Sequence, residues 1–366
     1  MPELHLSPNP NAVPPSLADA RELVLEYGWN ATAYQIVNPG IAHWFAERGD
    51  AVIGFVERGQ TSVVAGAPVC PPHRLDAVVA EFEQATAQRG RRVCYFGAEE
   101  RLEVLLRGRR THSAVLLGAQ PSWNPAHWAG ILDGKASLRA QLNRARNKGV
   151  TVAPMPSAEA TREPALRRVL DEWLATRGLP PMHFLVEPET LSRLADRRVF
   201  VARREREIVA FLVASPAPAR KGWLIEQFVR GRKAPNGTVE LLLDAAVRTF
   251  ADEGFEYVTL GLAPLSRHGI ARASNPFWLR MVLRWIRAHG RRFYNFEGLD
   301  RFKAKFQPER WEPVYAIVNQ PRFSPSTLYA VAAAFSDRSI VSTVVRAIWR
   351  AIQTEVQWLR RRLKFG

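Results

Sequence analysis

The first half of the chain alternates apolar segments of strand length with one longer amphipathic segment. The strand-length segments lie at 42–46, 51–57, 61–65, 92–97 and 113–118. Turn residues separate the first three, which is typical of an antiparallel meander. Between the third and the fourth, a pattern typical of a helix runs over 72–88 and ends at Gly90. This half therefore predicts a meander, a helix and a returning strand.

The second half repeats this order of elements, although the two halves do not resemble each other in sequence. Its predicted strands lie at 199–203, 207–214, 223–229 and 257–262, and its predicted helices at 163–177, 189–196 and 239–252. A meander followed by a helix and a strand that returns beside it is the order of the acetyltransferase-like (GNAT) fold. We therefore expect an α+β (mixed α/β) fold built from two tandem GNAT-like units.

A strongly basic segment, GKASLRAQLNRARNKG at 134–149, lies between the halves. At about 100° per residue in a helix, Lys135, Arg139 and Arg146 fall within about 40° of one another, with Arg144 and Lys148 nearby. A cationic stripe of this kind predicts contact with nucleic-acid phosphates. A solvated basic helix is the alternative.

The last segment, 337–364, is predicted to be an amphipathic helix. Its apolar residues fall on one arc of roughly 140°, and Arg and Lys side chains fill the adjoining face. A basic amphipathic helix can lie on an anionic membrane. The same stripe can equally dock on the protein, and Glu355 within the apolar arc favours docking, so both interpretations stay open.

Length and charge limit the possibilities further. The 366 residues, 47% of them hydrophobic, fit two compact units with real cores. We expect a lead at 1–20, the first unit at 21–133, the basic connecting helix at 134–150, the second unit at 151–320 and a helical segment at 321–366. The formal charge of +16 favours a polyanionic partner, either nucleic acid or anionic lipid, over a mere preference for Arg in composition.

Several classes of site and location are not supported. Cys70 and Cys94 form no CxxC pair, and the His residues lack metal-binding spacing, so we expect neither a disulfide framework nor a metal. The N-terminal residues lack the apolar core of a signal peptide, and no run approaches about 18 apolar residues. We expect a cytoplasmic protein.

Five strings along the second half resemble one family. They are NGTVE at 236–240, VTLGLAPLS at 258–266, YNFEGL at 294–299, FKAKFQP at 302–308 and WEPVY at 311–315. Together with SLR at 137–139 and NK at 147–148, they are similar to the catalytic region of bacterial lysyl- and alanyl-phosphatidylglycerol synthases. The resemblance covers about residues 25–320.

This resemblance implies two GNAT-like units separated by a basic helix, with aminoacyl-tRNA as the donor and a lipid hydroxyl as the acceptor. The charged tRNA is a co-substrate, and no other cofactor is implied. The chain lacks the N-terminal multi-span region of the best-known members, so we expect the acceptor to be reached from the aqueous side. A peripheral position on the inner face of the cell membrane is then expected, with a membrane protein that supplies or flips the lipid as a further partner.

Transfer of an aminoacyl ester to an alcohol passes through a tetrahedral oxyanion. It requires a proton relay, donors for the oxyanion and cations for the phosphates. Because no GxSxG elbow or Ser/His/Asp set is readable, direct attack by the acceptor is favoured over an acyl-enzyme. By the resemblance, Glu240 is a candidate to bind the aminoacyl ammonium or relay a proton; countering the helix dipole is its alternative role. Lys305 is the candidate phosphate or ester contact.

The remaining candidate substrate contacts lie in the same strings and in the loop before the third predicted helix of this half. They are Arg230, Asn236, Gly237, Thr238, Gly261, Ser266, Glu297 and Lys303. Lys303 and Lys305 stand two apart, so on a helix they cannot both face one site. The loop lacks the glycine series of acetyl-CoA enzymes, and Pro235 removes one amide donor. An acyl-CoA-dependent N-acyltransferase and a non-catalytic RNA- or membrane-binding module remain the alternatives.

Overall fold

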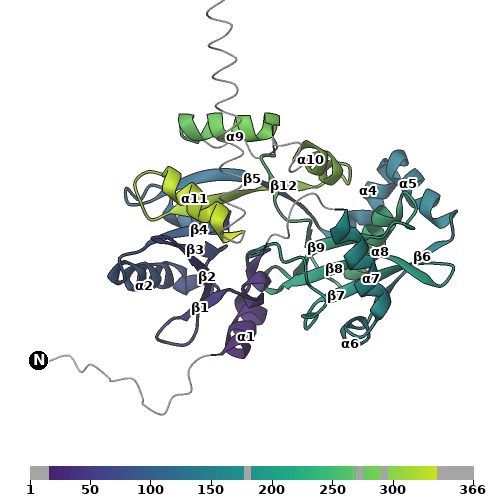
Figure 1. Ribbon diagram of the computed structural model, residues 1–366, viewed down its shortest axis with the longest axis horizontal. Coiled ribbons are helices and arrows are strands. Elements are labelled where there is room, and N and C mark those ends of the chain that lie inside the picture. Colours follow the sequence, from purple (N-terminus) through teal and green to yellow (C-terminus); the bar gives the residue numbers. More distant parts are fainter. Residues whose placement is uncertain (1–15, 177–182, 267, 269–274, 290–295, 336–366) are drawn as a thin grey trace, which may run out of the picture.

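The structure is a computed structural model that describes residues 16–176, 183–266, 268, 275–289 and 296–335 (Figure 1). The predicted C-terminal amphipathic helix at 337–364 lies outside these residues. Among the described helices, none combines the length and the apolar character needed to cross a bilayer.

One twelve-stranded sheet runs through the molecule in the order β1-β2-β3-β4-β12-β5-β10-β9-β8-β7-β6, with β11 paired to β5. The first half supplies β1 (Ala42–Phe45), β2 (Val52–Arg58), β3 (Thr61–Ala65), β4 (Arg92–Glu99) and β5 (Ser113–Trp123). The rest supplies β6 (Val150–Met155), β7 (Arg198–Arg204), β8 (Glu207–Ala217), β9 (Gly222–Arg230), β10 (Tyr257–Thr259), β11 (Ala263–Pro264) and β12 (Arg310–Val318).

Both halves share one topology, which confirms the predicted α+β fold with two GNAT-like units. In the first, β1, β2 and β3 are antiparallel, and α2 (Leu75–Gln88) leads to β4, which pairs with β3 in parallel. In the second, β6 to β9 are antiparallel, and α8 (Thr238–Asp252) leads to β10, which is parallel to β9. A parallel pair needs a long crossover, and a helix supplies it in each half.

The strand β12 connects the two halves. It lies within the second predicted unit, 151–320, but pairs with β4 and β5, two strands of the first. The boundaries drawn from the sequence stay predictions, because the sheet continues without a break from one half to the other.

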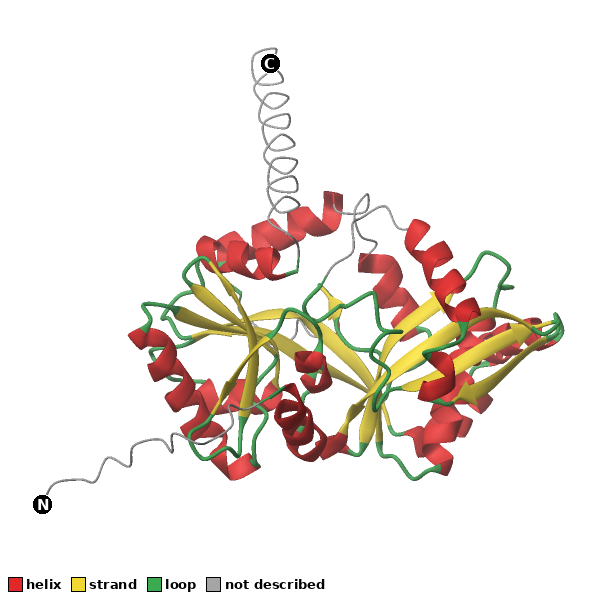
Figure 2. Cartoon of the chain, turned by 60° about the horizontal axis from the view of Figure 1, so that its bottom comes forward, coloured by secondary structure: helices red, strands yellow, loops and turns green. Residues whose placement is uncertain are grey.

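Helices cover both faces of the sheet (Figure 2). Besides α2 and α8, they are α1 (Leu17–Tyr27), α3 (Glu100–Leu106), α4 (Trp128–Gly134), α5 (Ala136–Arg146), α6 (Ser157–Ala160), α7 (Pro164–Ala175), α9 (Phe277–His289), α10 (Phe296–Ala304) and α11 (Pro325–Ala334). The basic segment between the halves is therefore helical, as predicted.

The helix predicted over 189–196 is wrong. This segment folds as turns and irregular chain. Its side chains bond to neighbouring elements instead: the Thr190 hydroxyl donates to Gln227 Oε1 at 3.0 Å, and Arg193 Nη1 donates to the carbonyl of Val37 at 2.9 Å. Tertiary hydrogen bonds of this kind outweigh a weak helical preference.

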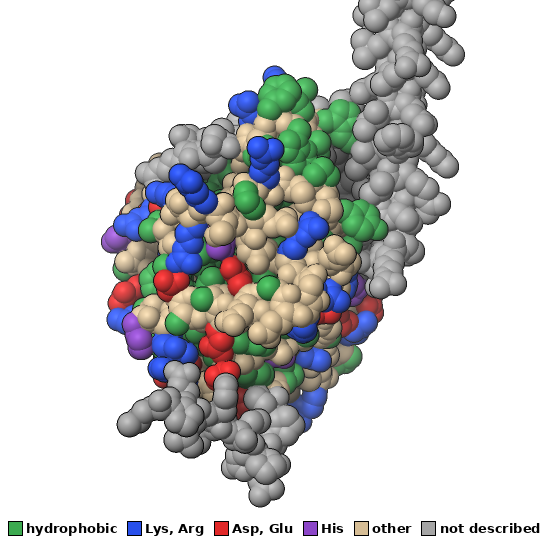
Figure 3. All heavy atoms as spheres, turned by 90° about the vertical axis from the view of Figure 1, so that its left-hand side faces the viewer, with side chains coloured by type: hydrophobic (Ala, Val, Ile, Leu, Met, Phe, Trp, Pro, Cys, Tyr) green, Lys and Arg blue, Asp and Glu red, His purple; other side chains and the backbone are tan. Residues whose placement is uncertain are grey.

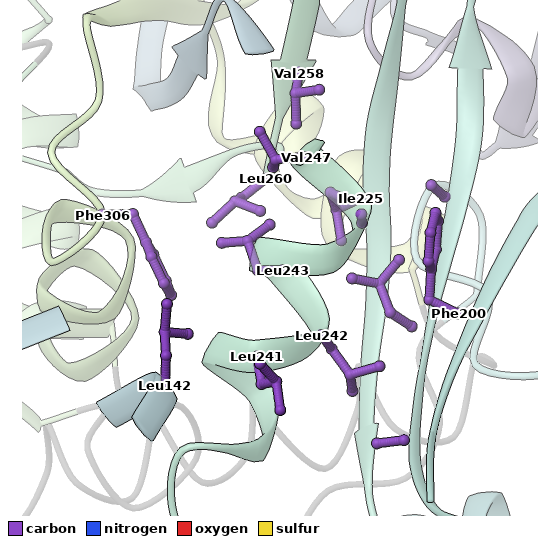
Figure 4. Packing of buried hydrophobic residues seen from close by; sticks show 14 of the residues in the cluster. Leu142, Phe200, Ile225, Leu241, Leu242, Leu243, Val247, Val258, Leu260 and Phe306 are labelled. Carbon is purple, nitrogen blue, oxygen red and sulfur yellow. The ribbon is translucent and has the colours of Figure 1, made fainter. Parts of the chain in front are cut away.

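Helix α8 lies at the centre of the core of the second unit. Its consecutive residues Leu241, Leu242 and Leu243 are all buried, so leucines point away from the helix in several directions. Figure 4 shows Leu142 and Phe306 on one side of this helix and the strand residues, including Ile225 and Phe200, on the other. Because α8 is packed on several sides, its first turn is held in a defined position.

Candidate active site

The sheet of the second unit opens where β10 ends. β9 and β10 pair over only three residues, the last being Thr259 opposite Leu224. The sequence predicted a strand as far as residue 262, but the chain leaves β9 at Leu260, while β9 itself continues to Arg230. Gly261 makes this departure possible because its φ of 68° lies in the left-handed region that favours glycine. In sheets of this kind, substrates bind at the ends of diverging strands.

The loop before α8 is held by its own side chains. The Arg230 guanidinium donates to the carbonyl of Ala234 at 2.8 and 3.2 Å and to Asn236 Oδ1 at 3.1 Å. Thr238 is buried, and its hydroxyl donates to the carbonyl of Pro235 at 2.8 Å. Three predicted substrate contacts therefore shape this loop.

Gly237 precedes α8 directly and has a φ of 96°. A Cβ at this position would lie 2.1 Å from the carbonyl oxygen of Gln141 on α5. Glycine is therefore required both by backbone conformation and by the close approach of the basic helix α5 to the start of α8.

Glu240 and Lys305, the two candidate catalytic residues, form an ion pair between Oε1 and Nζ. Glu240 lies in the first turn of α8, and Lys305 follows α10 directly. Their side chains are 13% and 29% exposed, respectively. The Lys305 ammonium also lies 4.7 Å from the ring centroid of Phe302 and 5.0 Å from that of Phe306, within the range of cation–π attraction. The pair is therefore partly shielded from water but still accessible.

Lys303 occupies a different environment. It is 5% exposed, and Nζ donates to the carbonyls of Leu260, Gly261 and Leu262 at 2.7, 2.8 and 2.8 Å. Burial lowers the pKa of this ammonium to about 7. All three of its N–H bonds point to the chain, so its ammonium has none left for a substrate.

The other predicted contacts lie at the edges of this site. Ser266 is buried, and its hydroxyl accepts from the backbone N–H of His268 at 3.2 Å. The His268 ring stacks on Trp311 with centroids 4.3 Å apart. Glu297, on α10, lies 3.6 Å from Arg301 one turn later. These contacts tie Ser266 and Glu297 to residues of their own segments.

Two of the predicted tRNA contacts on α5 bond to other residues of the protein. Arg139 Nη1 donates to the carbonyls of Leu132 at 2.6 Å and Asp133 at the end of α4. Arg146 Nη2 lies 2.9 Å from Asp244 Oδ2 on α8. Two members of the predicted stripe, Arg139 and Arg146, therefore also fasten α5 to its neighbours.

The remaining cations of this helix are differently placed. Arg144 and Lys148 are exposed, and Lys135, which precedes the first turn, is partly exposed. Within the described part of the chain, these three side chains form no ion pair. They are the members of the predicted group best placed to meet phosphates.

Asp244 is a residue that the sequence reasoning missed. It is 2% exposed and accepts from Trp128 Nε1 at 3.0 Å and Arg248 Nε at 2.8 Å as well as from Arg146. Its position four residues after Glu240 was the available signal, because residues four apart share a helix face.

Glu312, the glutamate of the WEPVY string, belongs to a second ionic cluster. The Arg220 guanidinium donates to both carboxylate oxygens of Glu312 at 2.8 and 2.6 Å and to Glu99 at 3.2 Å, and lies 3.6 Å from the ring centroid of Tyr257. The carboxylate of Glu312 also accepts from Gln120. Arg220 lies in the short 3-10 helix Pro218–Arg220, and its partners come from β12, β4, β10 and β5, so the cluster joins the strands where the two halves meet.

Neither cysteine is suited to act as a nucleophile. Both are buried, and burial raises the pKa of Cys70 to about 11 and that of Cys94 to about 12. A thiol rather than a thiolate is therefore present near neutral pH. In the residues that the structure describes, no group of three His, Cys, Asp or Glu side chains is arranged to hold a metal ion.

Comparison with known proteins places this geometry in context. Residues 21–318 match the family model described as phosphatidylglycerol lysyltransferase, C-terminal. The phosphatidylglycerol lysyltransferase of Bacillus subtilis is 27% identical over 310 residues, which cover 84% of this chain and 35% of that protein. The chain thus spans about a third of the length of that relative.

Two solved structures share the fold. L-PGS from Bacillus licheniformis has a TM-score of 0.72 at 25% identity, over 92% of this chain and 97% of that one. A C-terminal DUF2156 domain from Agrobacterium fabrum has a TM-score of 0.75 at 24% identity, over 88% and 97%. Both cover nearly all of this chain, so the arrangement of two halves around one sheet is common to them.

Proposed function

The chain belongs to the phosphatidylglycerol lysyltransferase C-terminal family, and on this premise we propose that it transfers an aminoacyl group from a charged tRNA to the hydroxyl of a lipid. Phosphatidylglycerol or another glycerolipid is the acceptor, and the charged tRNA is the only co-substrate. The observation that carries the proposal is the ion pair between Glu240 and Lys305.

This pair supplies the two groups that direct transfer requires. The acceptor oxygen attacks the ester carbonyl carbon, and its proton passes to the Glu240 carboxylate. The ammonium of Lys305 stabilises the oxyanion of the tetrahedral intermediate. The carbon–oxygen bond to the ribose then breaks, and the proton moves from Glu240 to the departing ribose oxygen. Atoms and charge balance, and no acyl-enzyme forms.

The basic helix α5 supports a tRNA donor. Arg144 lies on α5 and Lys135 and Lys148 flank it, and this helix approaches the start of α8 closely at Gly237. Phosphates bound along α5 would therefore place the charged end of a nucleic acid near Glu240. Such contacts are independent of base sequence and weaken with salt.

The exposed face of α9 supports a lipid acceptor. Phe277 and Met281 are 71% and 50% exposed, and the exposed Arg280 and Arg284 lie on the same face at helical spacing. This helix contains no Asp or Glu. Figure 3 shows hydrophobic and basic side chains together at the top of the molecule, where α9 lies in Figure 1. A short basic helix with exposed apolar residues is suited to the interface of an anionic membrane.

A transfer assay tests the proposal. The purified protein is incubated with phosphatidylglycerol vesicles and with tRNA charged in turn with each radiolabelled amino acid. We expect label in the lipid extract with at least one tRNA, and its loss after RNase treatment and in Glu240→Gln. The matched control, Glu256→Gln, breaks an exposed ion pair with Lys221 and should leave transfer unchanged. The absence of labelled lipid with every tRNA, together with acetyl-CoA turnover, would overturn the proposal.

A further inference from the structure

Lys303 is the most deeply buried cation next to the candidate active site, and direct transfer assigns it no role. Its ammonium is surrounded by the carbonyl oxygens of Leu260, Gly261 and Leu262. A buried lysine usually pairs with a carboxylate, since an unpaired buried charge is costly. Here three backbone carbonyls accept hydrogen bonds from the ammonium instead of a carboxylate.

These three carbonyls belong to the residues at which the chain leaves β10. Gly261 is buried with a positive φ, and its own N–H donates to Thr259 Oγ1 at 3.0 Å. Without the ammonium, the carbonyls of Leu260 and Gly261 would be buried without a partner, which destabilises this conformation of the chain. Lys303 therefore holds the departing segment of β10 in place.

The same side chain also anchors the end of α10. Lys305 is two residues further on, and its backbone N–H donates to the carbonyl of Arg301. The carbonyl of Phe306 accepts from Trp123 Nε1 on β5 at 3.0 Å. The chain from 303 to 306 is thus attached to β10 by Lys303, to α8 by Lys305 and to β5 by Phe306.

We propose that Lys303 is a positioning residue that sets the place of Lys305 against Glu240 by clamping the end of α10 to the point where β10 leaves the sheet. The inference rests on the proposed transfer and deepens it, because it identifies what holds the catalytic pair. Lys303 itself touches no reacting atom.

The clamp depends on the charge of Lys303, which titrates in an accessible range. Few charges surround it. Asp300 lies one turn earlier on α10 and favours the ammonium, and the chain between β10 and β11 contributes carbonyls. Lys305 lies two residues further on and is paired with Glu240 of α8. With the pKa of Lys303 at about 7, the clamp weakens as the pH rises through that value. A neutral amine is a poorer donor to carbonyls than an ammonium.

Steady-state kinetics of Lys303→Met test the role. We expect kcat for aminoacyl transfer to fall 10- to 100-fold, with KM for the charged tRNA changed less than about threefold, because the chemistry and not phosphate binding is disturbed. Lys303→Gln, which keeps two N–H donors without charge, should lose less. Lys221→Met, at an exposed lysine, should match the wild type.

The pH profile separates positioning from simple folding. The ratio of the wild-type rate to the Lys303→Met rate should fall as the pH rises from 6 to 8.5, and titration of the substrate amine cancels in that ratio. A ratio that stays constant, or a loss of rate explained by unfolded protein, would overturn the inference.

Hydrogen–deuterium exchange provides a readout that does not require activity. In Lys303→Met, peptides that cover 259–266 and 302–307 should exchange faster than in the wild type, while those of α2 should not change. An inactive wild type with this exchange pattern contradicts the proposed function but retains the clamp. An active wild type with unchanged exchange in the variant contradicts the clamp alone.

Discussion

Glu240 and Asp244 lie one turn apart on α8 and bind cations from two different elements. Glu240 pairs with Lys305 after α10, and Asp244 pairs with Arg146 on the basic helix α5. The first turns of α8 therefore connect the candidate catalytic pair to the helix proposed to bind tRNA. This arrangement separates residues that perform chemistry from those that hold the site together, and it leads to distinct predictions.

Removal of the Asp244 charge should destabilise the fold. Asp244→Asn weakens three hydrogen bonds to a buried carboxylate, and we expect the free energy of unfolding to fall by about 1–3 kcal/mol. The loss is smaller than for a fully buried ion pair because Arg146 and Arg248 are half exposed. Chemical denaturation measures the change. Asp252→Asn at the end of the same helix should cost less than about 0.5 kcal/mol.

Glu240 and Lys305 should act as a unit. Glu240→Gln and Lys305→Met should each reduce kcat about 10²- to 10³-fold, and the double variant should lose little more than either alone, because each removal already disrupts the pair. Single-turnover transfer measures the three rates. Fully additive losses would show that the two residues work independently. The exposed pair Lys221–Glu256 provides the matched control cycle.

The cations on α5 and beside its two ends that form no ion pair should govern the salt dependence of tRNA binding. Substitution of Lys135, Arg144 and Lys148 by Ala should reduce the slope of log affinity against log salt by about 2–3, since each phosphate contact contributes about 0.7–0.9. Filter binding at several salt concentrations measures the slope. If the slope stays at the wild-type value, tRNA binds elsewhere. Arg146→Ala should instead lower stability, because its guanidinium bonds to Asp244.

Vesicle binding should depend on the apolar face of α9. Phe277→Ser combined with Met281→Ser should weaken co-sedimentation with phosphatidylglycerol vesicles about tenfold or more, because both side chains are exposed. Val104→Ser and Val186→Ser remove exposed apolar side chains elsewhere and should have no effect. An equal loss of vesicle binding in the two double variants would indicate that general surface hydrophobicity, and not α9, directs binding.

The stability of the protein should depend on pH because of the titration of Lys303. Its pKa is about 7 in the folded chain and 10.5 in its ordinary state, so the unfolded chain binds one more proton between these values. Stability from this group therefore rises from pH 7 towards 10.5, with a slope of at most about 1.4 kcal/mol per pH unit, and is lost as the pH falls through 7. The difference in unfolding free energy between the wild type and Lys303→Met, measured at several pH values, isolates the contribution of Lys303. The advantage of the wild type over Lys303→Met in transfer rate should instead fall as the pH rises through 7.

Patterns along the chain were sufficient for the fold class, and the resemblance to a family supplied the candidate residues of the site. Alternation and helical spacing located most strands and the crossover helices, since these signals arise from neighbouring residues. The glycine and glutamate of NGTVE placed Glu240 at a helix start for the same reason. The helix predicted at 189–196 was wrong because side chains there bond to residues far away in the sequence, Gln227 on β9 and Val37 in a 3-10 helix.

The partners of those residues depended on contacts far apart in sequence. Periodicity cannot show that Lys305 meets Glu240, 65 residues away, or that Lys303 is buried against three carbonyls while Lys305 is not. It also could not place β12 between β4 and β5. Local patterning thus determined most of the elements that form, and the resemblance supplied the candidate residues of the site. Only the tertiary packing of residues 303–305, against α8 and against the chain that follows β10, decided which of two neighbouring lysines pairs with the carboxylate, because side-chain burial is set by the whole fold.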